Sequence, residues 1–114
     1  MKSKEAVIKF ESLSSEIRLD IFRLLLKHGE AGLVAGEIAE ALSLPNTNLS
    51  FHLKVLVHAN MISVEKEGRY LRYKALIGEM LFLIDFLTGE CCIDNPGYCQ
   101  SYRDKYPNLK NILK

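Results

Sequence analysis

The strongest constraint on the fold is a change of hydrophobic period in the middle of the chain. Apolar residues recur at helical spacing in two short runs, 34–42 and 49–60, which are separated by the polar break Ser43-Leu44-Pro45-Asn46. Residues 62–75 then alternate between apolar and polar around a turn at Glu67-Gly68, which is typical of a β-hairpin. Two short helices followed directly by a hairpin predict a winged helix-turn-helix.

Helical patterns also flank this unit on both sides. Val7 and Phe10 share one face of a short N-terminal helix, and a second helix with a core-facing stripe runs from Ser14 or Ser15 to His28-Gly29. A last helix covers residues 76–88. With 114 residues and 48% hydrophobic composition, the chain has enough apolar surface for one core. The predicted fold class is α+β, mainly helical, with N- and C-terminal helices that serve dimerisation.

The last helix predicts a homodimer. It is apolar on nearly all sides, since Leu81, Phe82 and Phe86 cover much of the surface beside its main stripe. Such a helix must be buried on several sides, and a chain this short has little with which to bury it. We therefore expect a dimer interface formed by Val7, Phe10, Met80, Leu83, Ile84 and Leu87.

The second helix of the helix-turn-helix presents an outward face that is suited to base contacts. This face carries small polar groups, one cation and one aromatic ring, while the hairpin behind it carries more Lys and Arg than Glu. The net charge of +1 gives no overall basic field, so DNA binding has to depend on such a local patch. A merely solvated helix face is the alternative; the basic hairpin favours DNA. The expected DNA contacts are Asn46, Thr47, Asn48, Ser50, Phe51, His52, Lys54, Lys66, Arg69 and Arg72.

Two motifs at a defined separation indicate a family. The run 49–56, Leu-Ser-Phe-His-Leu-Lys-Val-Leu, and the run 67–73, Glu-Gly-Arg-Tyr-Leu-Arg-Tyr, resemble the S-x-H-L helix and the G-R-x-x-x-Y wing of the ArsR/SmtB metal-responsive repressors. The resemblance covers residues 13–87 and implies a homodimer that binds an inverted-repeat operator and dissociates from it on ligand binding. Phe51 replaces the basic residue often found there. For His52, a structural hydrogen bond and a DNA contact both remain open.

Two metal sites associated with this family are missing from the sequence. The C-x-C pair that some members place at the start of the third helix corresponds to Val34 and Gly36 here, and the last helix contains Asp85 but no histidine. The remaining donors are Cys91, Cys92 and Cys99. We expect a type II turn over 95–98 to fold Cys99 back toward the vicinal pair, because proline and glycine stand where that turn favours them.

Three converging thiolates suit a soft ion that prefers three ligands, whereas tetrahedral zinc needs another donor. The sequence thus predicts As(III) or Sb(III) as regulatory ligand, and a subset of the family associated with arsenite sensing is similar in carrying a CC pair and a third cysteine after the last helix. The same cysteines allow a thiol redox sensor, another soft metal, or no ligand at all. A winged-helix protein-interaction module is an alternative of another class.

Residue 90 divides the chain into a DNA-binding and dimerisation domain, 1–90, and a cysteine-containing tail, 91–114. No enzyme is expected, because the three histidines all lie in the first part, away from the thiols, and no phosphate loop or dinucleotide motif is present. No signal peptide or membrane-spanning run is found either. Together with an odd number of clustered cysteines, this predicts a cytoplasmic protein without a membrane partner.

Overall fold

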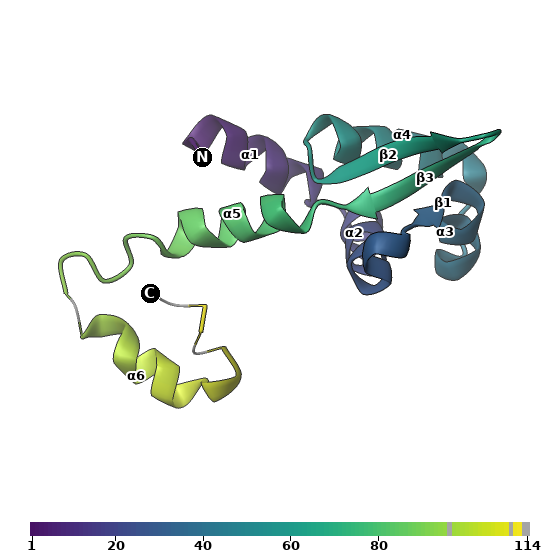
Figure 1. Cartoon of the computed structure of the whole chain (residues 1–114). Coiled ribbons are helices and arrows are strands. Elements are labelled where there is room, and N and C mark those ends of the chain that lie inside the picture. The colour runs from purple at the N-terminus through teal and green to yellow at the C-terminus, as the bar shows by residue number, and fades with distance from the viewer. Residues whose placement is uncertain (96, 110, 113–114) are drawn as a thin grey trace.

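The computed structural model describes residues 1–95, 97–109 and 111–112, without the side chains of Asn46 and Thr47. Six α-helices and one three-stranded antiparallel sheet make up this part of the chain (Figure 1) and confirm the predicted α+β, mainly helical class. None of the described helices is long and apolar enough to cross a membrane. The elements are α1 (Ser3–Ser12), α2 (Glu16–His28), η1 (Gly29–Ala31), β1 (Leu33–Val34), α3 (Ala35–Leu42), α4 (Asn46–His58), β2 (Ile62–Glu67), β3 (Tyr70–Ala75), α5 (Ile77–Thr88), α6 (Tyr98–Lys105) and η2 (Pro107–Leu109).

The helix-turn-helix is formed by α3 and α4. Ser43 ends α3 in the left-handed conformation, with φ of 53°, and the backbone of Pro45 is extended just before α4 begins. The predicted inward stripe of α4 is confirmed, since Leu49, Leu53 and Leu56 are buried. They pack into one core with Ile21 and Leu25 of α2 and Ile38 of α3.

The wing is the antiparallel hairpin of β2 and β3, which pairs from Ile62 with Ala75 to Glu67 with Tyr70. Gly68 closes it with a positive φ of 61°. The sequence did not predict β1, whose two residues are too few to show alternation; Leu33 pairs with Tyr73 of β3. Gly32 makes this pairing feasible, because a Cβ at its position would collide with the Tyr73 carbonyl.

The tail lies apart from the compact body of the molecule. Figure 1 shows that α5 extends away from the sheet and that α6 lies beyond the far end of α5. Among the described elements, α6 packs closely against η2 rather than against the body. The sequence did not predict α6, because its tyrosines at 98, 102 and 106 give only a weak helical pattern.

Candidate functional site

The recognition surface expected on α4 is exposed. Asn48, Ser50, Phe51 and Lys54 all face solvent, and the Phe51 ring is 62% exposed. Asn46 and Thr47 belong to the same helix, but their side chains lie outside the described part of the chain. An exposed aromatic ring beside small polar groups is suited to base edges, including an apolar contact with a thymine methyl.

His52 is held within the protein rather than presented to solvent like its neighbours. Its Nδ1 lies 3.2 Å from Arg18 Nη1, and the side chain is half-buried. Burial, followed by the nearby Arg18 charge, lowers the pKa of His52 below its usual value. The neutral ring then accepts a hydrogen bond from the guanidinium. Of the two roles open to His52, this geometry supports the structural hydrogen bond.

The basic residues of the wing fall into two groups. Arg72 Nε donates to Glu67 at 2.8 Å and its Nη1 donates to the Ala31 carbonyl at 2.9 Å, which fastens the wing to η1. Lys74 pairs with Glu65 at 3.7 Å. Lys66 and Arg69, by contrast, are exposed and make no ion pair within the described residues. The positive charge available to a phosphate is therefore concentrated at these two residues near the tip of the hairpin.

A buried lysine that the sequence did not reveal joins three helices. Lys9 of α1 is only 4% exposed, and its Nζ donates to the carbonyls of Ala59 and Asn60 at 2.9 and 3.2 Å. It also pairs with Glu79 of α5 at 3.2 Å, and Asn60 Nδ2 donates to that same carboxylate at 2.8 Å. A cation satisfies the carbonyls at the C-terminal end of α4. The spacing Ala6, Lys9, Ser12 marks this buried face of α1, but sequence reasoning favours apolar residues for such a face.

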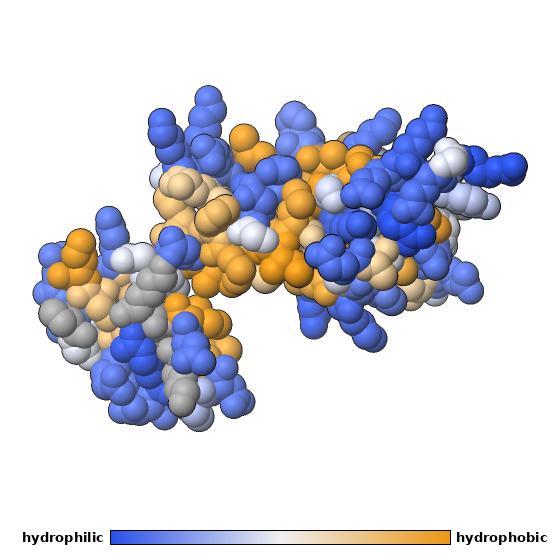
Figure 2. All heavy atoms as spheres, viewed as in Figure 1, coloured by the Kyte–Doolittle hydropathy of each residue, from blue (hydrophilic) through white to orange (hydrophobic). Residues whose placement is uncertain are grey.

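Three of the six residues of the predicted dimer interface are exposed in the single chain. Val7, Phe10 and Leu87 face solvent, Met80 and Ile84 are half-buried, and Leu83 is only 4% exposed because it packs into the chain's own core. Figure 2 shows the resulting apolar surface in orange between the body and the tail. Other exposed apolar side chains on α5 are Ile77, Leu81, Phe82 and Phe86.

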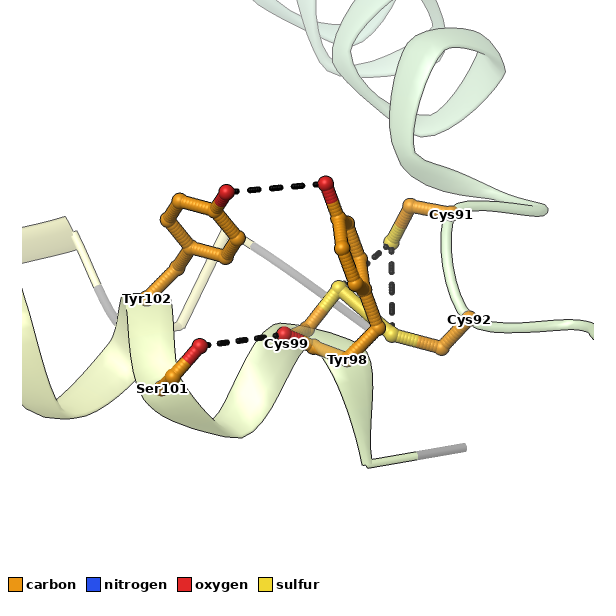
Figure 3. Close-up of a disulfide and its surroundings, with 6 residues drawn as sticks. All are labelled: Cys91, Cys92, Tyr98, Cys99, Ser101 and Tyr102. Atoms are coloured by element: carbon orange, nitrogen blue, oxygen red, sulfur yellow. Dashed lines mark hydrogen bonds between the residues drawn. A yellow bond between two sulfur atoms is a disulfide. The ribbon is translucent and has the colours of Figure 1, made fainter. Parts of the chain in front are cut away.

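The three cysteines converge at the far end of α5, as predicted (Figure 3). Cys91 and Cys92 follow α5, while Cys99 lies in the first turn of α6 and is 2% exposed. Cys92 and Cys99 form a disulfide with their Cα atoms 6.4 Å apart, and Cys91 is a free thiol. The Cys91 sulfur lies 3.1 Å from that of Cys99 and 3.9 Å from that of Cys92. All three sulfurs lie within 4.8 Å of one another, so one ion could contact all three after reduction.

The turn that brings Cys99 back is of a different type from the one predicted. The Tyr98 N–H donates to the Asn95 carbonyl at 2.9 Å, which is the hydrogen bond of a four-residue turn. Gly97 has φ of −88° and ψ of −4°, the values of a type I turn, so the predicted type II turn is wrong. Pro96 itself lies outside the described residues. The hydrogen bond leads directly into α6, which a type I turn can do because its backbone is already near-helical.

Comparisons with known proteins agree with this architecture. A family model described as a helix-turn-helix domain matches residues 13–65. The chain is 31% identical over 93 residues to the arsenical resistance operon repressor of Bacillus subtilis (strain 168), covering 74% of this chain and 87% of that protein.

Solved structures show the same fold. Reduced HlyU from Vibrio cholerae N16961 matches with a TM-score of 0.60 and 27% identity over 75% of this chain and 90% of that one. An ArsR-like transcriptional regulator from Rhodococcus sp. RHA1 matches with a TM-score of 0.66 over 97% of this chain and 94% of that one. Because the two sequences are only 24% identical, this match supports the fold alone. The helix-turn-helix, the wing and the Bacillus relative together lead to one assignment. The chain belongs to the ArsR family of winged-helix transcriptional repressors.

Proposed function

We propose that this protein is a repressor responsive to As(III) or Sb(III): a homodimer that binds an inverted-repeat operator and releases it when the ion binds Cys91, Cys92 and Cys99. The convergence of the three sulfurs within 4.8 Å carries this proposal. The 31% identity to an arsenical resistance operon repressor supports it.

Three cysteine sulfurs fit a soft ion that takes three ligands better than an ion that takes four. In the reduced protein, three S–As bonds would replace the three As–O bonds of arsenous acid, and the three thiol protons would leave with the hydroxides as three waters. Among the described residues, the cysteine cluster includes no histidine or carboxylate as a fourth ligand. Structural zinc sites are almost always four-coordinate, so zinc would lack one ligand here.

The DNA-binding side of the proposal uses the two exposed surfaces of the body. Asn48, Ser50 and Phe51 of α4 would face base edges in the major groove, while Lys66 and Arg69 of the wing would contact phosphates. The exposed apolar face of α1 and α5 would be covered by a second copy. Two recognition helices related by a dyad match half-sites about one helical turn apart, or a multiple of it.

The connection between ligand and DNA would run along α5. One end of this helix adjoins the cysteines, and the other is fixed to the end of α4 through Glu79, Lys9 and Asn60. A ligand shifts such an equilibrium only if it binds one arrangement more tightly than the other. An ion that pulls the cysteines together would shift the dimer from its DNA-binding arrangement to a released one if its binding also changes the angle of α5 in the dimer.

The test is fluorescence anisotropy of a labelled duplex that covers the region upstream of the protein's own gene, titrated with arsenite in a phosphine reductant. Wild type should bind the duplex and release it with arsenite. Cys91→Ser, Cys92→Ser and Cys99→Ser should each bind the duplex and fail to release it. Ser101→Ala changes the same helix without removing a thiol and should respond like wild type. Release of DNA by arsenite from the triple-serine variant would overturn the proposal.

The disulfide supports a second candidate function, a thiol redox sensor. Cys91 lies 3.1 Å from Cys99, so all three sulfurs are near enough for disulfide exchange. A peroxide would oxidise two thiols to the disulfide. Hydrogen peroxide would be reduced to two waters, and an organic hydroperoxide to one alcohol and one water. If peroxide releases the duplex, a dithiol reverses this release, and arsenite has no effect on the reduced protein, then the redox function replaces the arsenic one.

A further inference from the structure

Polar contacts near its start attach helix α5 to the body. The helix packs only loosely against the other described elements, and Leu83 is its one buried apolar side chain. The Leu76 N–H fixes the start of the helix by donating to the Met61 carbonyl at 2.9 Å. Three residues further on, Glu79 Oε1 accepts two hydrogen bonds from other elements. Because apolar contacts are non-directional and hydrogen bonds are directional, these polar contacts fix the direction in which α5 leaves the body.

The two donors to Glu79 come from α1 and from the end of α4. Lys9 Nζ lies 3.2 Å and Asn60 Nδ2 lies 2.8 Å from the carboxylate oxygen. Lys9 Nζ also donates to the carbonyls of Ala59 and Asn60, at 2.9 and 3.2 Å, so all three donors of its ammonium group are used. Lys9, Asn60 and Glu79 thus form one group, the Lys9 cluster, which joins α1, the end of α4 and the start of α5.

Asn60 suits this cluster through both its backbone and its side chain. Its φ of 59° is the left-handed conformation that ends many helices, and the Met61 N–H donates to the Leu56 carbonyl at 3.0 Å, as in such endings. Glycine is the usual residue there, since it adopts this conformation at the least cost. Asparagine also tolerates it and, unlike glycine, supplies the amide that donates to Glu79. This position therefore ends α4 and anchors α5 at once.

A buried ion pair is a poor source of net stability, but it fixes geometry. Lys9 is only 4% exposed, and the attraction between two charges often fails to repay the free energy of taking them out of water. Apolar residues of similar volume are often neutral or stabilising in place of such a pair. What they lack are directed bonds to three elements. The burial of Lys9 among these acceptors therefore points to a role in arranging α1, α4 and α5.

These three helices have different tasks in the proposed function. Helices α1 and α5 present the exposed apolar residues that a second copy would cover, while α4 presents Ser50 and Phe51 to DNA. We infer that Lys9 and Glu79 are positioning residues that fix the angle of α4 relative to the dimer interface, and thereby the spacing of half-sites that the protein accepts. This inference rests on the homodimer and the operator of the proposed function, but not on its ligand.

A small change of angle is enough for such an effect. Helix α4 has 13 residues, which make it about 20 Å long, so a tilt of about 5° at its C-terminal end moves its N-terminal end by about 2 Å. In a symmetric dimer both recognition helices move, and their separation then changes by up to about 4 Å. Consecutive base pairs lie about 3.4 Å apart. Loss of the Lys9 cluster should therefore allow binding to half-sites whose spacing differs by about one base pair.

The test measures binding of the full-length protein to three labelled duplexes by fluorescence anisotropy, with a phosphine reductant and without arsenite. One duplex carries the inverted repeat upstream of the protein's own gene, and the other two have one base pair inserted or removed at its centre. Wild type should bind the first at least about 10-fold more tightly than the others. Lys9→Met keeps the length of the side chain and removes its charge, and it should reduce this ratio to about 3-fold or less.

Two further variants make the test specific to the cluster. Asn60→Gly permits the same backbone conformation and removes only the amide that donates to Glu79, so it should lower the ratio less than Lys9→Met does. Lys27→Met makes the same chemical change as Lys9→Met at an exposed site of α2 and should keep the wild-type ratio. Circular dichroism and sedimentation show whether each variant is folded and dimeric.

The outcomes separate this inference from the function on which it rests. If Lys9→Met weakens binding to all three duplexes equally, Lys9 has a structural role alone, and the inference is refuted while operator binding stands. The same holds if Lys9→Met and Asn60→Gly both keep the wild-type ratio, or if wild type itself shows no preference. If wild type is monomeric or binds none of the duplexes, the proposed function fails and the inference fails with it. If Lys9→Met does not fold, the ratio measured for Asn60→Gly decides.

Discussion

The winged-helix body, residues 1–90, and the cysteine tail, residues 91–112, are stabilised by different means. The body has a continuous core in which Ile21, Leu25, Ile38 and Leu56 are fully buried. In the described part of the tail, Cys99 is the one buried side chain, and apolar residues such as Leu109 remain about half exposed. Apolar packing thus holds the body together, whereas the described tail buries little apolar surface and is cross-linked by the Cys92–Cys99 disulfide.

The largest expected effect is the loss of a core side chain from the body. Leu25→Ala should lower the free energy of unfolding by about 2–5 kcal/mol, because the side chain is fully buried and its removal leaves a cavity. Leu109→Ala removes the same atoms from the tail and should change the free energy of unfolding by a few tenths of a kcal/mol at most. Urea denaturation followed by circular dichroism, at one fixed protein concentration, measures both. Equal losses would show that the tail is part of the cooperative core.

The second effect is stabilisation of the tail by arsenite, the ligand that we propose. At arsenite concentrations about 100-fold above the dissociation constant, binding should raise the free energy of local unfolding at the binding site by about 2.7 kcal/mol. Hydrogen exchange of amides in α6 should then slow by about 100-fold in the reduced protein, while amides of α2 in the body should slow much less. Mass spectrometry of peptic fragments resolves the two regions. Equal protection of α2 and α6 would contradict the separation of body and tail.

The third effect concerns DNA binding, which we assign to residues of the body alone. Arg69→Ala should weaken binding to all duplexes and reduce the dependence of log K on log salt by about 1 for each phosphate that Arg69 neutralises. Lys105→Ala removes one cation from the tail and should leave the affinity unchanged. Salt titrations of anisotropy give both slopes. Arg72→Ala is informative as well: because Arg72 holds the wing to η1, its removal should cost stability in addition to affinity.

Sequence reasoning succeeded where the signal is periodic and failed where it is not. The stripe Leu49, Leu53, Leu56 and the alternation of β2 and β3 were predicted, because burial of one face imposes a regular spacing. The two-residue β1 is too short for any period. Lys9 was missed because a buried charge is acceptable only once its partners, Ala59, Asn60 and Glu79, are known to lie beside it.

For the candidate site, the convergence of the three cysteines was predictable and their surroundings were not. The spacing of Cys91, Cys92 and Cys99 was enough to expect convergence, although the turn type was wrong. An apolar cavity beside them depends on how Tyr102, Leu109 and their neighbours pack in three dimensions, and no sequence period encodes that. Likewise, only the structure shows that Leu83 packs into its own chain and that Arg72 is bound to Glu67.

The smallest expected effect is a pH dependence in the body that the tail does not share. Burial, and then the charge of Arg18, lower the pKa of His52 below its usual value of about 6.5. The unfolded chain therefore binds more protons than the folded one, so the stability that neutral His52 contributes is present above about pH 6.5 and is lost as the pH falls below it. His52→Gln, whose amide oxygen can still accept from Arg18 and does not titrate, should flatten the curve of unfolding free energy between about pH 5 and pH 7.5. His58→Gln removes a solvent-exposed histidine from the same helix and is the matched control. A His52→Gln curve parallel to that of wild type would show that the Arg18–His52 hydrogen bond does not couple protonation to folding.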